Sequence, residues 1–205
     1  MRFHIGPLPE DDRFEPEQGP WRKLREPSFG MLMLIASLVG VGVVVIMVWA
    51  WGALADLAIP DQIQLTITLS ELLRAVVLVI ALMLAHELSH ALALPGFGLT
   101  SATIVGFWPQ KATPYVAYRD EITRNRHILV GVMPFLVLSV LPLVVGPLLG
   151  YTPLWLVVLS TLNGAFSSAD LLNGVLLLVR LPRSAVVRDR GPDAWWRLCD
   201  DPGAA

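Results

Sequence analysis

Four apolar stretches, each long enough to cross a lipid bilayer as a helix, limit what this chain can fold into. They run from Phe29 to about Leu54, from Leu72 to Leu94, from His127 to about Leu149 and from Leu154 to about Val179. About 20 apolar residues in a helix span the hydrocarbon core, where only helices and closed barrels satisfy their own backbone polar groups. Hydrophobic residues make up 55% of the chain and charged residues 16%, an unusual balance for a soluble domain. We therefore predict an all-α membrane protein with four transmembrane helices.

The segments outside these stretches are polar, so we divide the chain into three regions. Residues 1–28 mix acids, bases and prolines, and we expect a loosely ordered leader. Residues 29–180 form the membrane domain, in which 55–70 links the first two spans, and 181–205 form a polar tail.

Lys and Arg gather in the leader, in the link between the second and third spans, and in the tail, while the other two links hold none. The positive-inside rule therefore places both termini in the cytoplasm. The excess of Arg over Lys is typical of a GC-rich prokaryote, so we expect a prokaryotic plasma membrane.

Residues 99–118 change in character, because β-branched and aromatic residues replace the aliphatic run. The sequence Pro109-Gln110-Lys111-Ala112 divides them in two. This pattern predicts a short β-hairpin or a pair of extended segments between the second and third helices. Two interpretations remain open: an amphipathic loop resting on the lipid headgroups, and an exposed strand edge that holds an unfolded substrate by strand addition.

The second apolar stretch carries His86-Glu87-Leu88-Ser89-His90 in its last third. Histidines at i and i+4 lie on one face of a helix, where two imidazoles can bind one metal ion while the intervening Glu reaches a water on that metal. Titratable side chains are costly within a bilayer and usually mark a functional site. The single cysteine, Cys199, excludes a Cys-rich site, so histidine and carboxylate must hold the metal. We predict a Zn²⁺ site with His86 and His90 as ligands and Glu87 as general base.

Asp170 is the candidate third ligand, which a catalytic zinc site requires. The second and fourth spans run in the same direction. His86 lies about 15 residues after Glu71, and Asp170 about 16 after Leu154, so both sit roughly 22–24 Å down their helices. Asn163, Ser167, Asp170 and Gly174 recur at helical spacing on one face. Asn163 is a candidate for substrate or oxyanion binding, or for a hydrogen bond between helices. Ser167 is a candidate for orienting the Asp170 carboxylate.

The chain resembles a small membrane family of zincin peptidases. Four features carry the resemblance: the segment from Ala85 to Ala91, the β-like stretch, the proline-bearing third helix, and the fourth helix with Asn163 and Asp170. The likeness covers roughly residues 70–190. More distantly, the chain is similar to the site-2 proteases, in which a later helix supplies an Asn and an aspartate ligand with a proline between them and a glycine after the aspartate. Here no proline intervenes, and Leu171 follows Asp170. The resemblance implies hydrolysis of peptide bonds in membrane or membrane-proximal polypeptides, whereas the spacing of the motif indicates only a hydrolytic metal site.

Two other classes of function compete with this interpretation. A divalent-metal transporter also places His and Glu on membrane helices, but it needs a chain of polar sites through the bilayer. A catalytically inactive zinc-binding scaffold would retain the ligands without needing Glu87. The net charge of −2, with no basic patch, argues against a nucleic-acid partner, so the expected partners are the bilayer and a polypeptide substrate.

Overall fold

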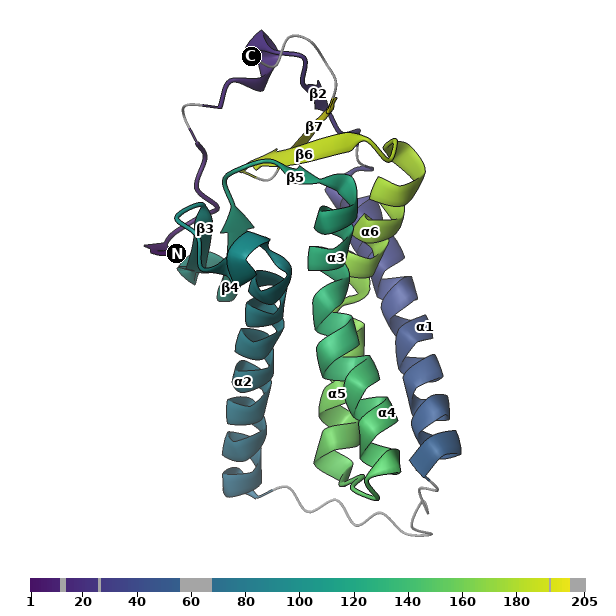
Figure 1. Ribbon diagram of the computed structural model, residues 1–205. Coiled ribbons are helices and arrows are strands. Elements are labelled where there is room, and N and C mark those ends of the chain that lie inside the picture. Colours follow the sequence, from purple (N-terminus) through teal and green to yellow (C-terminus); the bar gives the residue numbers. More distant parts are fainter. Residues whose placement is uncertain (12–13, 26, 56–67, 192, 200–205) are drawn as a thin grey trace.

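The computed structural model describes residues 1–11, 14–25, 27–55, 68–191 and 193–199. Its helices stand side by side, and two small sheets lie together at one end of them, where the N-terminus also lies (Figure 1). The helices are α1 (Phe29–Ala55), α2 (Leu69–Ala93), α3 (Arg124–Phe135), α4 (Leu141–Leu148), α5 (Leu154–Phe166) and α6 (Ser168–Arg180). Short 3₁₀ turns cover Pro16–Gln18, Pro95–Gly98 and Pro109–Lys111. Of the link predicted at 55–70, residues 56–67 lie outside the described part of the chain.

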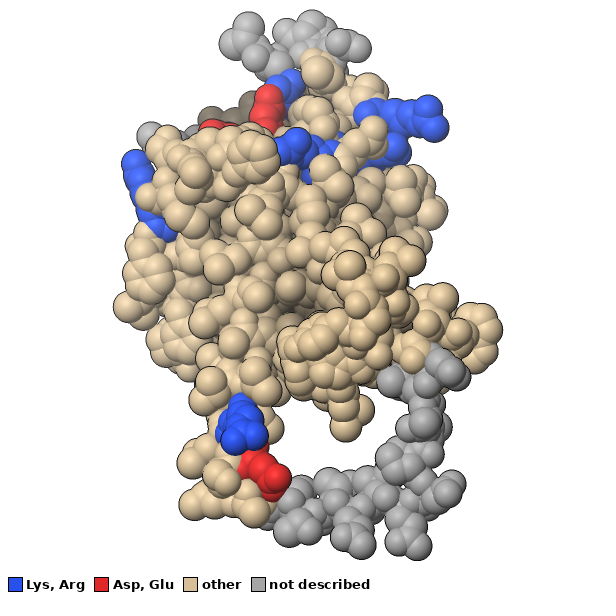
Figure 2. Space-filling view, turned by 60° about the horizontal axis from the view of Figure 1, so that its bottom comes forward, with Lys and Arg blue, Asp and Glu red and all other residues tan. Residues whose placement is uncertain are grey.

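Three helical stretches are long and apolar enough to cross a membrane: Gly30–Ala55, Leu69–Ala93 and Arg124–Leu148. The bent pair formed by α5 and α6 makes a fourth if it counts as one span. Figure 2 shows a broad face without charged side chains, with charged groups gathered toward its two ends. This is the surface that a membrane-spanning bundle presents to lipid.

The fourth span is broken, which the sequence pattern did not predict. Its two helices meet at Ser167 with a bend of 43°. The Ser167 hydroxyl donates a hydrogen bond to the Asn163 carbonyl one turn earlier, at 2.9 Å. A serine that bonds back to the i−4 carbonyl bends a helix, and this gives the physical reason for the break. The new helix start places Asp170 in the first turn of α6, where the helix dipole favours a carboxylate.

The third span, which carries Pro134, Pro142 and Pro147, contains a widened turn. Residues Leu136–Val140 between α3 and α4 are π-helical, and the Leu141 N–H donates to the carbonyl of Leu136, five residues back. Beside this turn the Pro134 carbonyl accepts a hydrogen bond from the Asn163 side chain. Such π-turns occur mostly as single turns within helices, frequently at functional sites.

The fold is mostly helical but not all-α, because two sheets accompany the helices. In the first sheet, β3 (Thr103–Trp108) and β4 (Thr113–Tyr118) form the predicted hairpin, and β1 (Arg2–Ile5) pairs in parallel with β3. In the second, β2 (Arg22–Lys23), β7 (Asp193–Leu198), β6 (Ala185–Arg190) and β5 (Ile122–Thr123) are antiparallel neighbours in that order.

The leader and the tail are therefore tied into the fold, contrary to our expectation of a loosely ordered leader. An apolar cluster beneath the β6–β7 hairpin explains their order. It consists of Leu24 from the leader, Leu177 and Leu181 at the end of α6, and Ala185 and Val187 from the tail. Burying these side chains compensates the entropy lost in ordering two polar segments. The cluster also anchors α6, the helix that carries Asp170.

The turn after α2 fixes the end of the helix that carries the histidines. The helix ends at Ala93, next to the predicted end of the second apolar stretch at Leu94, and Gly96, Phe97 and Gly98 all have positive φ. A Cβ atom at Gly98 would lie 2.8 Å from the Ala91 carbonyl oxygen, so the chain turns back tightly against α2. Arg126 of α3 donates to the Leu94 carbonyl at 2.9 Å and ties this turn to the third span.

Candidate metal centre

His86 and His90 of α2 and Asp170 of α6 direct their side chains to one point. The Nε2 atom of His86 lies 3.2 Å from Asp170 Oδ2, and that of His90 lies 3.8 Å from the same oxygen. His86 is buried, with 7% of its surface exposed. Two ligand atoms about 2.1 Å from one tetrahedral metal ion are about 3.4 Å apart, so these separations fit a shared divalent cation. His86 and Asp170, which the sequence placed at equal depth along their helices, are therefore in contact.

Glu87 lies beside this point. Ligand atoms of His86, Glu87 and His90 lie within 4.8 Å of one another. The backbone of Val116 in β4 lies beside the Glu87 carboxylate. The predicted hairpin is therefore packed against the helix that carries the motif.

The tautomer of His90 follows from its partner. Its Nδ1 lies 2.8 Å from the backbone carbonyl oxygen of Val130, which can only accept a hydrogen bond. Nδ1 therefore carries the proton, and the Nε2 of the neutral ring keeps a free lone pair. A metal-binding histidine usually has this form, with its outer N–H held by a carbonyl or carboxylate.

The tautomer of His86 is fixed by Asn163. The Asn163 Nδ2 donates to the Pro134 carbonyl at 3.0 Å and to Ser139 Oγ at 2.9 Å. Because the carbonyl accepts only, this end of the amide must be the nitrogen, and Oδ1 is the atom that faces His86 Nδ1 at 2.9 Å. His86 Nδ1 therefore donates, and its Nε2 faces Asp170 with a free lone pair. Both histidines are thus held in the form that a metal requires.

This arrangement gives Asn163 the hydrogen bonds between helices that are one of the roles considered for it. Its side chain has no exposed surface and is engaged at both ends, so it is not open to a substrate. The Ser167 hydroxyl donates to the Asn163 carbonyl and contacts Asn163 Nδ2 at 3.5 Å. It therefore supports Asn163, and the hydrogen bond to Asp170 considered for it is not formed.

Two groups that contact this set were missed by reasoning from the sequence. Ser139 lies in the π-turn, donates to the Ser160 carbonyl at 2.7 Å and accepts from Asn163. A buried serine in an apolar span is a weak signal that could have found it. The Val130 carbonyl gives no signal, because any residue could supply that oxygen.

A cavity of about 170 Å³ opens beside the motif. It is lined by Met83, His86 and Glu87 of α2, Pro114 of β4 and Phe166 of α5. Asp170 remains partly exposed, with 30% of its side-chain surface accessible. The site therefore combines a buried His86 and a partly buried His90 with a cavity between the helices and the hairpin that Glu87 lines.

A protein-family model with the description "Putative zincin peptidase" matches residues 79–186, more than half of the chain. This range begins in α2 and ends in β6, so it includes the histidine motif, the hairpin and Asp170. No curated protein and no solved structure matches the chain, and the distant likeness to site-2 proteases stays a prediction. The chain therefore belongs to the "Putative zincin peptidase" family, with a histidine–glutamate group in a helix that could hold a metal ion.

Proposed function

We propose that this protein is a membrane-embedded zinc metallopeptidase that hydrolyses peptide bonds of membrane or membrane-proximal polypeptides. The observation that carries the proposal is the convergence of His86 Nε2, His90 Nε2 and Asp170 Oδ2 beside Glu87. Three protein ligands with one open position are typical of catalytic zinc, whereas structural zinc sites are closed by four. Two neutral imidazoles and one carboxylate also suit zinc in ligand type.

His86, His90 and Asp170 would hold the ion, and the hydrogen bonds from Nδ1 to Asn163 and Val130 would keep both rings aimed at it. Zinc in this position supplies a water of lowered pKa and a Lewis acid for the scissile carbonyl. Glu87 takes the proton of the water that adds to the peptide carbonyl and then delivers it to the leaving amine nitrogen. Glu87 lines the cavity where the peptide would lie, with the Val116 backbone of β4 beside its carboxylate.

The position of the site within the bundle supports hydrolysis over transport. From Ala75 to Ala85, α2 carries no polar side chain, so the motif has no titratable neighbour toward the far end of its own helix. A transport path needs polar sites across the bilayer. The site instead lies at the end of α2 that carries the hairpin, near the polar segments that we predict to be cytoplasmic (Figure 1).

Removal of the metal tests the proposal. The purified full chain in liposomes is expected to contain one zinc ion per chain and to cleave a labelled transmembrane peptide. A strong chelator should abolish cleavage, and added zinc should restore it, because the ion supplies the nucleophile. Zinc content and product are measured together, with zinc flux across the same liposomes as a third readout. Flux without cleavage would favour a transporter, and bound zinc with neither activity would favour an inactive scaffold.

Asn163→Leu is expected to weaken zinc binding by about 10–100-fold, the usual cost of losing the outer partner of a metal-binding histidine. The leucine cannot accept the His86 Nδ1 proton, so the ring loses both its tautomer and its orientation. Zinc affinity is measured by competition with a chromophoric chelator. Ser160→Ala is the matched control, because it removes a buried polar group of the same helix that bonds to Trp51 instead. Wild-type zinc affinity in folded Asn163→Leu would contradict this role.

A further inference from the structure

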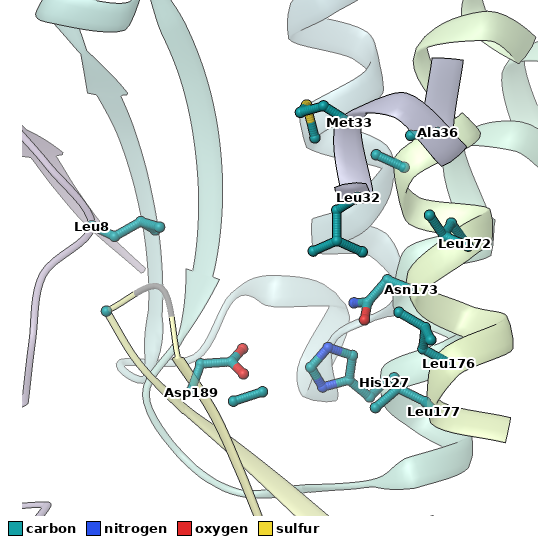
Figure 3. Close-up of a pocket in the computed structure, with 13 residues that line it drawn as sticks. Leu8, Leu32, Met33, Ala36, His127, Leu172, Asn173, Leu176, Leu177 and Asp189 are labelled. Carbon is teal, nitrogen blue, oxygen red and sulfur yellow. The ribbon is translucent and has the colours of Figure 1, made fainter. Parts of the chain in front are cut away.

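A second cavity lies against a different face of α6 from the metal centre. It has a volume of about 290 Å³ and is bordered by Leu8, α1, α3, α6 and the β6–β7 hairpin (Figure 3). Leu32, Met33 and Ala36 of α1 and Leu172 and Leu176 of α6 form much of its apolar wall. None of the residues proposed to bind metal or move protons lines it. A cavity of this size with a few convergent polar groups has the character of a ligand site.

Three polar side chains from three different elements face one another in this cavity: His127 of α3, Asn173 of α6 and Asp189 of β6 (Figure 3). His127 Nδ1 is buried and has no hydrogen-bond partner among the described residues. No described residue forms a hydrogen bond or ion pair with the Asp189 carboxylate either. Water reaches this carboxylate from the cavity, but the protein atoms around it raise its pKa above the usual range, against the influence of His127. Buried polar atoms without partners are rare, so a group in the cavity that satisfies His127 Nδ1 is expected, and the exposed Asp189 carboxylate is free to contact the same group.

The charge of the cavity indicates the sign of that group. The side chain of Glu10 lies against Gly191, which lines the cavity, so a second carboxylate lies at the rim. Among the described residues, no Lys or Arg side chain lines the cavity. Two carboxylates, an imidazole and a carboxamide together favour a cationic hydrogen-bond donor.

The cavity continues into an apolar groove along α1. The groove has a volume of about 470 Å³ and shares Met33, Ala36 and Ala169 with the cavity. Its α1 residues extend from Met33 to Val45, about 18 Å of helix at roughly 1.5 Å per residue. Half of a hydrocarbon core about 30 Å thick is about 15 Å, so the groove matches the length of one acyl chain in one leaflet.

We propose that this cavity and groove bind one membrane lipid with a primary-amine headgroup, of the phosphatidylethanolamine class. The ammonium lies among Asp189, Asn173 and His127, and one acyl chain lies along α1. A primary ammonium has three N–H donors for these three acceptors, whereas the quaternary ammonium of phosphatidylcholine has none. The site is separate from the metal centre and does not depend on the function proposed for it.

Native mass spectrometry of the full chain, titrated with lipids that have identical acyl chains, tests this proposal. Phosphatidylethanolamine is expected to bind about tenfold more tightly than phosphatidylcholine or phosphatidylglycerol, in line with hydrogen bonds to a charged group. Asp189→Asn should remove the preference for the primary amine, while Ser37→Phe, which fills the groove, should weaken binding of all lipids at this site about tenfold. The matched controls are Asp120→Asn, an exposed acid outside the cavity, and Leu38→Phe, which faces lipid beside the groove.

The comparison of lipids on the wild-type chain needs no variant, so a variant that fails to fold leaves the test intact. Equal binding of the three lipids, or a preference for the anionic one, would overturn the proposal. Binding of phosphatidylethanolamine that is unchanged by both Asp189→Asn and Ser37→Phe would do the same, because the lipid would then lie elsewhere. Binding of free ethanolamine as tightly as the lipid would show that the groove takes no part.

Discussion

Glu87→Gln is expected to keep one zinc ion per chain and to lower the turnover number by about 10²–10⁴-fold, the usual contribution of a general acid–base group. Glutamine preserves the shape of the side chain and can still face the Val116 N–H, but it cannot take a proton from water or return it to the leaving amine. Zinc is counted by elemental analysis of the purified chain. Turnover is measured with a labelled transmembrane peptide at saturating concentration, so that a change in substrate binding does not enter.

Glu71→Gln is the matched control for this variant. Glu71 lies on the same helix and forms a capping box with Thr68 at its other end, a role that glutamine also fills. Full turnover and full zinc content are expected for the control. If Glu87→Gln loses zinc instead, Glu87 is a ligand and the proposed assignment of roles is wrong. If it keeps both zinc and turnover, another group moves the proton.

His90→Ala and Asp170→Asn are expected to lose zinc and cleavage together. Each removes a ligand from a set of three, so the loss of affinity should exceed the 10–100-fold cost of an outer partner and reach the order of 10³-fold or more. Zinc that binds only the folded state raises the unfolding temperature, which gives an independent readout. The wild-type chain should be stabilised by added zinc, and both variants should show little or no such stabilisation.

His4→Ala and Asp120→Asn control for the loss of a histidine and of a carboxylate elsewhere in the chain. His4 lies in β1 and Asp120 follows β4, so neither belongs to the converging set. Both controls should bind zinc as the wild type does. Retention of zinc by Asp170→Asn with wild-type affinity would show that the carboxylate is not a ligand, whatever its distance from the histidines.

The parts of this site that the sequence predicted are those set by helical geometry. The spacing of His86 and His90 put both imidazoles on one face, and equal depth along two helices of the same direction paired them with Asp170. The role of Asn163 was left open, because helical spacing gives its face but not its partners. The hydrogen bond from His90 to the Val130 carbonyl could not be predicted, since every residue has a backbone oxygen and the sequence does not distinguish this one.

The parts of the fold that the sequence missed depend on contacts between distant segments. The strand β1 pairs with β3 about a hundred residues later, and neither β1 nor β2 is long enough to show a periodic pattern. Their order comes from pairing and from the apolar cluster around Leu24, and a local window does not contain that information. The break at Ser167 likewise comes from one side-chain hydrogen bond within an apolar run that reads as a single helix.

The hairpin between α2 and α3 was predicted in part: its strands were expected from the sequence, but its contacts were not. Its strands were predicted from β-forming residues around Pro109, and the structure has them at Thr103–Trp108 and Thr113–Tyr118. Its contact with Glu87 through Val116 was not predicted, because it depends on how the hairpin folds back against α2. Whether the hairpin holds substrate by strand addition stays a prediction. Pro114 of the hairpin lines the cavity beside His86 and Glu87.

The position of the metal itself is the most direct test of the central claim. Anomalous diffraction at the zinc edge, from crystals of the full chain grown with zinc, should give one peak about 2.0–2.2 Å from His86 Nε2, His90 Nε2 and one oxygen of Asp170. Glu87 should lie nearby without coordinating the ion. A peak held by the two histidines with Asp170 turned away, or a peak elsewhere in the chain, would contradict the account.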